Sequence, residues 1–336
     1  MPCTVIVGGF FGDEGKGKIV AYLAKSDKAD VAVRGGVGPN AGHTVVCDGR
    51  VYKTRMLPSA LLSEQTRLMI GPGVLLNVDI LLEEIERFHT KDRTFVDPQC
   101  GLIESPHIHR DSADPSLKKI GTTGTGTGPA NADRALRIAR LARDTVQLSE
   151  YLQDVSTIVN RSIDSNQTVL VEGTQGTFLS LYHGIYPFVT SKDVTASAIC
   201  ADIGIGPKKV SDVLIVYKAY VTRVGSGPLE GELPQEETTA KGWTEFGSVT
   251  GRLRRASPFN FELAKRAAML NSATQVALTK LDILFPSDAG VKEFSRLSDG
   301  AKTFLNKIEK EVGLKVTIVG TGQEVDDIID RRQELG

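Results

Sequence analysis

The chain has 336 residues, of which 40% are hydrophobic and 24% are charged, and these proportions exclude a disordered or fibrous protein. Its 40 lysines and arginines balance 41 aspartates and glutamates, so it lacks the overall positive charge that attracts nucleic acid or an anionic membrane. The cysteines are isolated, and no apolar run reaches the roughly 20 residues of a membrane-spanning helix. The sequence therefore predicts a soluble, cytoplasmic protein with no nucleic-acid or membrane partner.

The chain opens with a strand, a glycine turn and a helix. Residues 4–7 form a β-branched run, residues 12–18 are rich in glycine, and residues 19–24 show a helical pattern. A second predicted strand at 31–34 leads into a second glycine turn at 35–44. This order is typical of a doubly wound α/β sheet.

Further apolar runs predict strands that are covered on both faces, and hence a mostly parallel central sheet with helices on both sides. These runs are residues 68–70, 168–171, 213–216, 275–279 and 316–319. Helical patterns occupy residues 80–88 and 301–309, whereas residues 105–119, with two prolines, are predicted to be an irregular loop. Because no repeat, linker or change of composition interrupts the chain, we expect a single domain over residues 1–336.

The first glycine turn, residues 12–18, reads GDEGKGK. Glycines let backbone amides approach an anion, and a lysine and a helix N-terminus add positive charge, so the turn predicts a phosphate-binding loop. The usual pattern GxxxxGK[ST] is not met, because Phe10 and Gly17 stand where glycine and a hydroxyl residue are required. The fold is therefore expected to resemble P-loop NTPases with a variant loop. Asp13 and Glu14 put carboxylates beside the anion, which indicates Mg²⁺ binding or base catalysis.

The second glycine turn ends in His43. A lone histidine is more often structural than catalytic. Here, however, it follows a second strand of the same predicted sheet, which brings it to the same edge as Asp13. The two side chains are candidates for an acid/base pair around one reacting centre.

The third turn, residues 119–129, alternates glycines with hydroxyl residues. Hydroxyl and amide donors suit a phosphomonoester, although a plain linker has the same composition. The turn is predicted to lead into a helix with arginines at i,i+3 spacing, of which one is available to a phosphate; they are Arg134, Arg137, Arg140 and Arg143.

A candidate base-recognition element lies near the C-terminus. Residues 279–282 read TKLD and follow the predicted strand at 275–279. An aspartate at this place accepts hydrogen bonds from N1–H and the 2-amino group of guanine, while the stem of the lysine packs over the ring. Four residues are weak evidence by themselves.

Together, eight ordered blocks over almost the whole chain resemble the adenylosuccinate synthetase family, in a short form similar to the archaeal one. The blocks are residues 12–18, 40–44, 121–124, 172–176, 186–191, 222–225, 250–252 and 279–282. The resemblance implies a Mg²⁺-dependent ligase of purine and AMP biosynthesis that uses GTP to join L-aspartate to IMP through a 6-phosphoryl intermediate. It also implies a homodimer in which Arg137 crosses the interface.

The resemblance implies the following site residues. The catalytic pair is Asp13 and His43, and Asp13 also binds Mg²⁺ together with Gly42. GTP is bound by Gly12, Asp13, Glu14, Gly15, Lys16, Gly17, Lys18, Gly42, His43, Thr44, Arg254, Lys280, Leu281, Asp282, Gly320, Thr321 and Gly322. IMP is bound by Asp13, Lys16, Asn40, Ala41, Gly42, His43, Thr123, Arg137, Gln175, Thr190 and Arg252. Aspartate is bound by Ser248, Val249, Thr250, Gly251, Arg252, Leu253 and Arg254.

Two alternatives remain at this point. A phage branch of the family acts on dGMP and has a small residue in place of Asp13, which is present here. A GTPase-like binding protein would need neither His43 nor the arginines of residues 250–254. Leu253 interrupts an arginine run that is typical of the family, so the aspartate-binding segment departs from the family pattern at this position.

Overall fold

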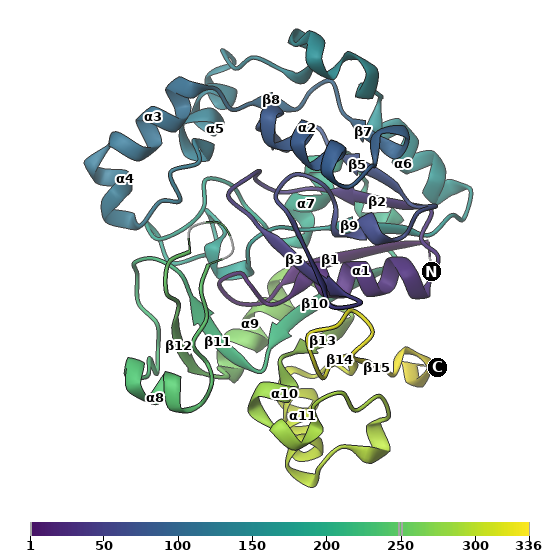
Figure 1. Ribbon diagram of the computed structural model, residues 1–336, viewed down its shortest axis with the longest axis vertical. Helices are drawn as coiled ribbons and strands as arrows, with labels where there is room; N and C mark the ends of the chain where they lie inside the picture. Colours follow the sequence, from purple (N-terminus) through teal and green to yellow (C-terminus); the bar gives the residue numbers. More distant parts are fainter. Residues whose placement is uncertain (1, 248, 250, 336) are drawn as a thin grey trace.

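The computed structural model describes residues 2–247, 249 and 251–335, and a nine-stranded sheet runs through its centre (Figure 1). In spatial order the strands are β15 (Ile328–Asp330), β14 (Val316–Gly320), β13 (Gln275–Thr279), β10 (Asp212–Lys218), β1 (Cys3–Gly8), β9 (Val169–Glu172), β2 (Val31–Arg34), β5 (Arg67–Ile70) and β7 (Thr94–Val96). All neighbours pair in parallel except β15, which runs antiparallel to β14 at one edge. The predicted mostly parallel sheet is confirmed.

Helices cover both faces of this sheet. The helices are α1 (Lys16–Ser26), α2 (Val78–Arg87), α3 (Ser105–Ala113), α4 (Pro115–Ile120), α5 (Thr127–Leu136), α6 (Val155–Asp164), α7 (Ala196–Ile203), α8 (Gln235–Ala240), α9 (Phe261–Asn271), α10 (Leu281–Leu284) and α11 (Asp299–Val312). Within β1, Val5 and Val7 join a core with α6, α7, α9 and α11, whereas Ile6 joins a core with α1. This alternation is what a strand buried on both faces requires, because successive side chains point to opposite sides.

Three small two-stranded sheets flank the central one: β3 (His43–Cys47) with β4 (Arg50–Thr54), β11 (Tyr220–Arg223) with β12 (Arg255–Pro258), and β6 (Leu75–Leu76) with β8 (Gly101–Leu102). The β3–β4 hairpin packs beside α1. Among the residues that the model covers, no helix is both long and apolar enough to cross a bilayer.

The loop predicted over residues 105–119 is wrong, since the structure has α3 and α4 there. Pro106 and Pro115 lie in the first turn of each helix, where a missing N–H costs nothing and the fixed φ favours a helix start. The Asp114 side chain accepts from the backbone N–H of Ser116 and caps α4. These prolines therefore begin helices.

Parallel strands place the segments that follow them at one edge of the sheet. The predicted turn residues 12–18 follow β1, residues 173–176 follow β9, residues 280–282 follow β13 and residues 321–322 follow β14. In an open α/β sheet this carboxyl edge is where ligands bind. The topology thus brings four separate sequence motifs to one place.

Candidate active site

The glycine loop after β1 is shaped from within by Glu14. Its side chain is buried and its Oε1 accepts from the backbone N–H groups of Phe10 (3.0 Å) and Gly12 (2.8 Å), while Oε2 pairs with Lys16 Nζ at 3.0 Å. Asp13 has φ +60°, a left-handed backbone that few L-residues adopt and that is common at functional sites. The Glu14 carboxylate therefore organises the loop, and Glu14 has only its backbone groups left to bind a nucleotide.

The remaining positions of this loop contact other predicted motifs. Asp13 Oδ2 pairs with Arg254 Nη2 at 2.7 Å, and Lys16 Nζ donates to the backbone oxygen of Gln175. A Cβ at Gly15, which has φ +89°, would lie 3.1 Å from Thr279 Cγ2. Residues assigned to GTP, IMP and aspartate therefore gather around one loop.

Lys18 faces the C-terminal part of the chain. Its Nζ donates to the backbone oxygens of Gly322 (2.7 Å) and Asp327 (2.9 Å). Burial lowers the pKa of Lys18 to about 8. This lysine was expected to bind GTP, and the structure uses its ammonium group to hold residues 320–327 against α1.

Gly17 explains why the loop departs from the usual P-loop pattern. A Cβ at Gly17 would lie 2.9 Å from His43 Cβ and 3.0 Å from Ser59 Oγ. Since real Cβ atoms essentially never approach within 3.0 Å, a serine or threonine at this position would displace the histidine. His43, at the start of β3, thus lies directly against the phosphate loop.

His43 is part of a buried group that the sequence did not reveal. Its Nδ1 contacts Glu172 Oε1 and lies 3.0 Å from Ser59 Oγ. Ser59 donates its hydroxyl to Glu172 Oε1 (2.6 Å) and its backbone N–H to Oε2 (2.7 Å). Glu172 ends β9 and is fully buried. The sequence signal for this group is a carboxylate at the end of an apolar strand. Such a strand is buried, and a buried charge requires partners.

Burial and the neighbouring charges act in opposite directions on the pKa values of Glu172 and His43. Burial alone would raise the pKa of Glu172, but the charges and hydrogen bonds of His43, Arg34 and Ser59 lower it to about 2. Burial lowers the pKa of His43, and Glu172 opposes that change.

Several expected binding residues carry buried polar atoms without a partner in the described structure. They are Asn40 Oδ1, Gln175 Nε2, Arg254 Nε and Asp282 Oδ1. Asn40 Nδ2 donates to Thr190 Oγ1 at 3.3 Å, which joins two residues expected to bind IMP. Because buried polar groups are normally hydrogen-bonded, these atoms mark places where a polar ligand fits.

The guanine-recognition segment lies beside the glycine loop. Thr279 Oγ1 donates to the backbone oxygen of Glu14 at 2.6 Å, and Lys280 has φ +62° before α10. Burial raises the pKa of Asp282. Leu281 and Thr321, which are also predicted to bind GTP, have buried side chains. Leu281 belongs to the core, and Thr321 Oγ1 donates to Val291, so both offer only backbone groups.

The arginine segment reaches the third glycine turn. Arg252 Nη2 donates to the backbone oxygen of Gly121 at 3.0 Å, and Thr123 in the same turn contacts Thr125 through its hydroxyl at 2.9 Å. Leu253 is 43% exposed. Ser248 and Thr250 lie outside the described residues.

The predicted arginine-bearing helix is wrong beyond Leu136. Helix α5 ends there, and Arg137 has φ +66°, with its N–H donating to Arg134 and Asp133. This left-handed C-cap stops the helix, so Arg140 and Arg143 leave the i,i+3 row. Arg137 is exposed at the end of the helix.

A second buried ionic group, also missed, surrounds Arg254. Glu245 Oε2 pairs with Arg254 Nη1 (2.7 Å) and Lys218 Nζ (2.8 Å), and its Oε1 accepts from Tyr220 at 2.5 Å. Tyr220 stacks on Trp243 with ring centres 4.6 Å apart. We call residues 218, 220, 243, 245 and 254 the Glu245 cluster. Apart from Arg254, no sequence motif marked its members, because they lie on separate segments.

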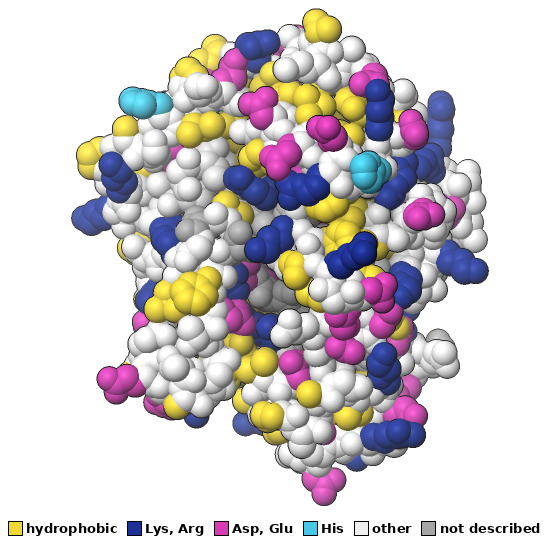
Figure 2. All heavy atoms as spheres, viewed as in Figure 1, with side chains coloured by type: hydrophobic (Ala, Val, Ile, Leu, Met, Phe, Trp, Pro, Cys, Tyr) yellow, Lys and Arg dark blue, Asp and Glu magenta, His cyan; other side chains and the backbone are white. Residues whose placement is uncertain are grey.

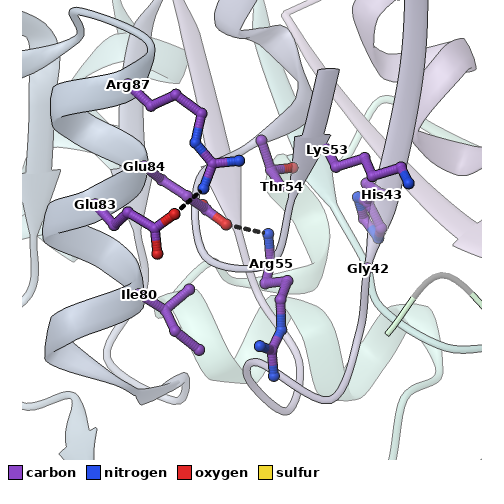
Figure 3. A pocket seen from close by; sticks show the side chains of 9 residues that line it. All are labelled: Gly42, His43, Lys53, Thr54, Arg55, Ile80, Glu83, Glu84 and Arg87. Carbon is purple, nitrogen blue, oxygen red and sulfur yellow. Dashed lines mark hydrogen bonds and ion pairs between the residues drawn. The ribbon is translucent and has the colours of Figure 1, made fainter. Parts of the chain in front are cut away.

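A cavity of about 270 Å³ borders Gly42 and His43 (Figure 3). Its wall includes Glu84 of α2, whose carboxylate accepts from the backbone N–H groups of Arg55, Met56 and Leu57. These contacts fix the segment that leads to Ser59. In the space-filling view, Lys and Arg side chains surround a hollow near the middle of this face (Figure 2).

The donor chemistry fits Mg²⁺ shared with a nucleotide. The described residues contain no group of three or more His, Cys, Asp and Glu able to form an all-protein metal site. Mg²⁺ usually takes one or two protein carboxylates and completes its shell with waters and phosphates. The Asp13 side chain, 26% exposed, supplies such a carboxylate next to the loop.

Comparison with known proteins identifies the family. A family model described as adenylosuccinate synthetase matches residues 5–147 and 138–289. A curated protein named adenylosuccinate synthetase from Methanocaldococcus jannaschii is 52% identical over 339 residues, covering 100% of this chain and 98% of the relative. The chain belongs to the adenylosuccinate synthetase family. A second adenylosuccinate synthetase, from Archaeoglobus fulgidus, is 51% identical over 335 residues and 99% of both chains.

Solved structures of the adenylosuccinate synthetase family have the same fold. A fully ligated adenylosuccinate synthetase from Plasmodium falciparum matches with a TM-score of 0.91 and 25% identity, over 98% of this chain and 99% of that one. The succinoaminodeoxyadenylate synthetase of cyanophage S-2L, bound to dGMP and dATP, matches with a TM-score of 0.82 and 26% identity, over 99% and 97%.

Proposed function

We propose that this chain catalyses the GTP-dependent joining of L-aspartate to IMP, which gives adenylosuccinate, GDP and phosphate. The observation that carries the proposal is the convergence on residues 12–18. Arg254 reaches Asp13, Gln175 reaches Lys16, Thr279 packs on Gly15 and His43 packs on Gly17. Three ligand sites expected from separate motifs therefore share one loop.

The chemistry assigns a role to each of the two catalytic residues. Asp13 accepts the N1 proton of the hypoxanthine ring, which makes O6 a better nucleophile toward the γ-phosphorus of GTP. The bond from O6 to phosphorus forms as the bond to the GDP leaving oxygen breaks. The amine of aspartate then attacks C6, and the O6–C6 bond breaks with release of phosphate. Through both steps His43 stabilises the phosphoryl group by hydrogen bonding.

Mg²⁺, when bound at Asp13 and the backbone oxygen of Gly42, would neutralise phosphate charge. The chain itself positions the reactants. Phosphoryl transfer depends mainly on placement and charge neutralisation, to which Lys16 and the loop amides contribute.

The proposed nucleobase site uses a buried carboxylate oxygen, and the proposed aspartate site uses two guanidinium groups. Asp282 Oδ1 is buried without a partner and suits the N–H donors of guanine. The guanidinium groups of Arg252 and Arg254 suit the two carboxylates of aspartate, because arginine forks match carboxylate geometry.

We also propose a homodimer in which Arg137 crosses the interface. Arg137 is exposed between Leu136, 66% exposed, and Ile138, 67% exposed. Two large exposed apolar side chains beside an arginine are typical of an interface. The cytoplasmic location stays a prediction.

The assay follows the absorbance change of adenylosuccinate formation with purified protein. We expect product only when IMP, GTP and aspartate are all present, and we expect Asp13→Asn to abolish turnover while GTP binding by calorimetry persists. Product from dGMP in place of IMP would favour the phage-type reaction instead. GTP hydrolysis without IMP and aspartate would favour a GTPase-like protein. A near wild-type rate for Asp13→Asn would remove the base assignment.

A further inference from the structure

The buried contacts of His43 identify a second residue that acts on the reaction. We propose that Glu172, held by Ser59, is a positioning residue that keeps one ring hydrogen of His43 on Nδ1 and leaves Nε2, when it also carries a hydrogen, to donate to the phosphoryl group. This proposal rests on the proposed function, in which His43 contacts the transferred phosphoryl group.

Hydrogen-bond geometry determines which ring nitrogen carries the proton. Ser59 has one hydroxyl hydrogen, which it donates to Glu172 Oε1 at 2.6 Å. Toward His43 Nδ1, 3.0 Å away, the Ser59 oxygen can therefore act only as an acceptor. Glu172 Oε1, the other neighbour of Nδ1, is a carboxylate oxygen and also accepts. Because both neighbours are acceptors, one ring hydrogen lies on Nδ1, and Nε2 is the nitrogen left for a ligand, to which it donates when it also carries a hydrogen.

The carboxylate of Glu172 has partners beyond the packing of β9. Glu172 is fully buried at the end of β9, and both its oxygens are used by Ser59 and His43. Replacing a whole buried ion pair by apolar side chains is often tolerated, whereas removing one partner leaves the other charge uncompensated. The carboxylate balances the buried Arg34, and its contact with the imidazole is the one that bears on the reaction.

The surroundings leave the ring little freedom to turn. Gly17 lies against His43 Cβ on the phosphate-loop side, and Glu84 anchors the segment before Ser59. Two cations, Arg34 and Lys16, also act on His43. Lys16 is paired with Glu14, so Glu172 is the carboxylate that both contacts the ring and opposes Arg34.

The test compares Glu172→Gln and Ser59→Ala with a matched control, Asp212→Asn. Asp212 is also a buried carboxylate, but it lies at the amino-terminal end of β10, whereas Glu172 lies at the carboxyl-terminal end of β9. It accepts hydrogen bonds from Thr274 and Gln275. Nitrogen-15 NMR of labelled histidine reports the tautomer in the free protein, and His43→Asn identifies the signal among five histidines. Steady-state assays give kcat and KM.

We expect His43 of the wild type to carry a hydrogen on Nδ1. For Glu172→Gln, we expect a changed His43 signal and a fall in kcat of about 10²-fold, the scale of losing a well-placed acid/base group, with KM for IMP and GTP little changed. Ser59→Ala should give a smaller fall in kcat, because it keeps the carboxylate. Asp212→Asn should lower thermal stability and leave both kcat and the His43 signal unchanged.

Two results would overturn the positioning role. One is a wild-type His43 that carries a hydrogen on Nε2 and none on Nδ1, which decides the matter even if Glu172→Gln does not fold. The other is a folded Glu172→Gln protein with wild-type kcat or an unchanged His43 signal. Absence of adenylosuccinate formation by the wild type would instead contradict the proposed function, and the tautomer measurement would still stand by itself.

Discussion

Replacing Glu245 by glutamine tests the ionic group around Arg254. Burial opposes ionisation of Glu245, yet Lys218, Lys280 and Tyr220 lower its pKa from the ordinary 4.5 to about 2. At about 1.4 kcal/mol per pH unit, that difference corresponds to about 3 kcal/mol of stability at neutral pH. Because the folded-state pKa is depressed, this stabilisation is complete above pH 4.5 and is lost as the pH falls through about 2.

The expected change in melting temperature follows from the size of the chain. For 336 residues, an unfolding entropy of about 2.1 cal/mol/K per residue turns about 3 kcal/mol into a Tm decrease of about 4 °C. Trp243 is the single tryptophan and stacks on Tyr220, so its emission reports on the Glu245 cluster directly. Thermal scans at pH 7 and one fixed scan rate measure both quantities.

The matched control is Glu262→Gln, which removes an exposed carboxylate paired with Lys265. Exposed pairs contribute little, so we expect no measurable change in its Tm. A Glu245→Gln protein with the Tm and tryptophan emission of the wild type would refute the reasoning. It would mean that the buried charges of Lys218 and Arg254 are stable without their shared carboxylate.

Two further substitutions test single contacts. Asp282→Asn places a donor where guanine presents its own donors, so kcat/KM for GTP should fall about 10- to 100-fold. The kcat/KM for xanthosine triphosphate, which has a carbonyl in place of the 2-amino group, should rise. An unchanged ratio of the two values would contradict the assignment. Gly17→Ala puts a Cβ 2.9 Å from His43 Cβ. A displacement of His43 by about 1 Å should lower kcat about 10²-fold, while calorimetry should show an unchanged affinity for GTP. A Gly17→Ala protein with the kcat of the wild type would show that the loop adjusts without moving His43.

Much of the fold was predictable because its strands have a simple physical signature. The apolar runs at residues 31–34 and 275–279 coincide with β2 and β13, and the helical pattern at 80–88 coincides within two residues with α2 (Val78–Arg87). Such runs are buried on both faces, so the identity of each residue depends on burial alone. The prolines of residues 105–119 misled because proline breaks a helix interior but favours a first turn.

The site was predictable where motifs follow strands and hidden where partners come from distant segments. Asp13, His43 and Asp282 follow or begin strands, and the sheet topology brings their neighbourhoods together. Glu172 and Glu245 bind partners 113 and 27 residues away, and nothing in local sequence specifies such pairings. The end of α5 at Leu136 was missed for a related reason, since a left-handed Arg137 is not encoded by an obvious glycine.

The hydrogen bonds from Lys18 to Gly322 and Asp327 constrain the order in which the enzyme folds during its synthesis. The lysine and its acceptors are separated by 304 and 309 positions along the chain. During synthesis on the ribosome, the nucleotide loop therefore emerges long before the segment that closes over its helix. A nascent chain therefore cannot form these two hydrogen bonds until Gly322 and Asp327 have left the ribosome.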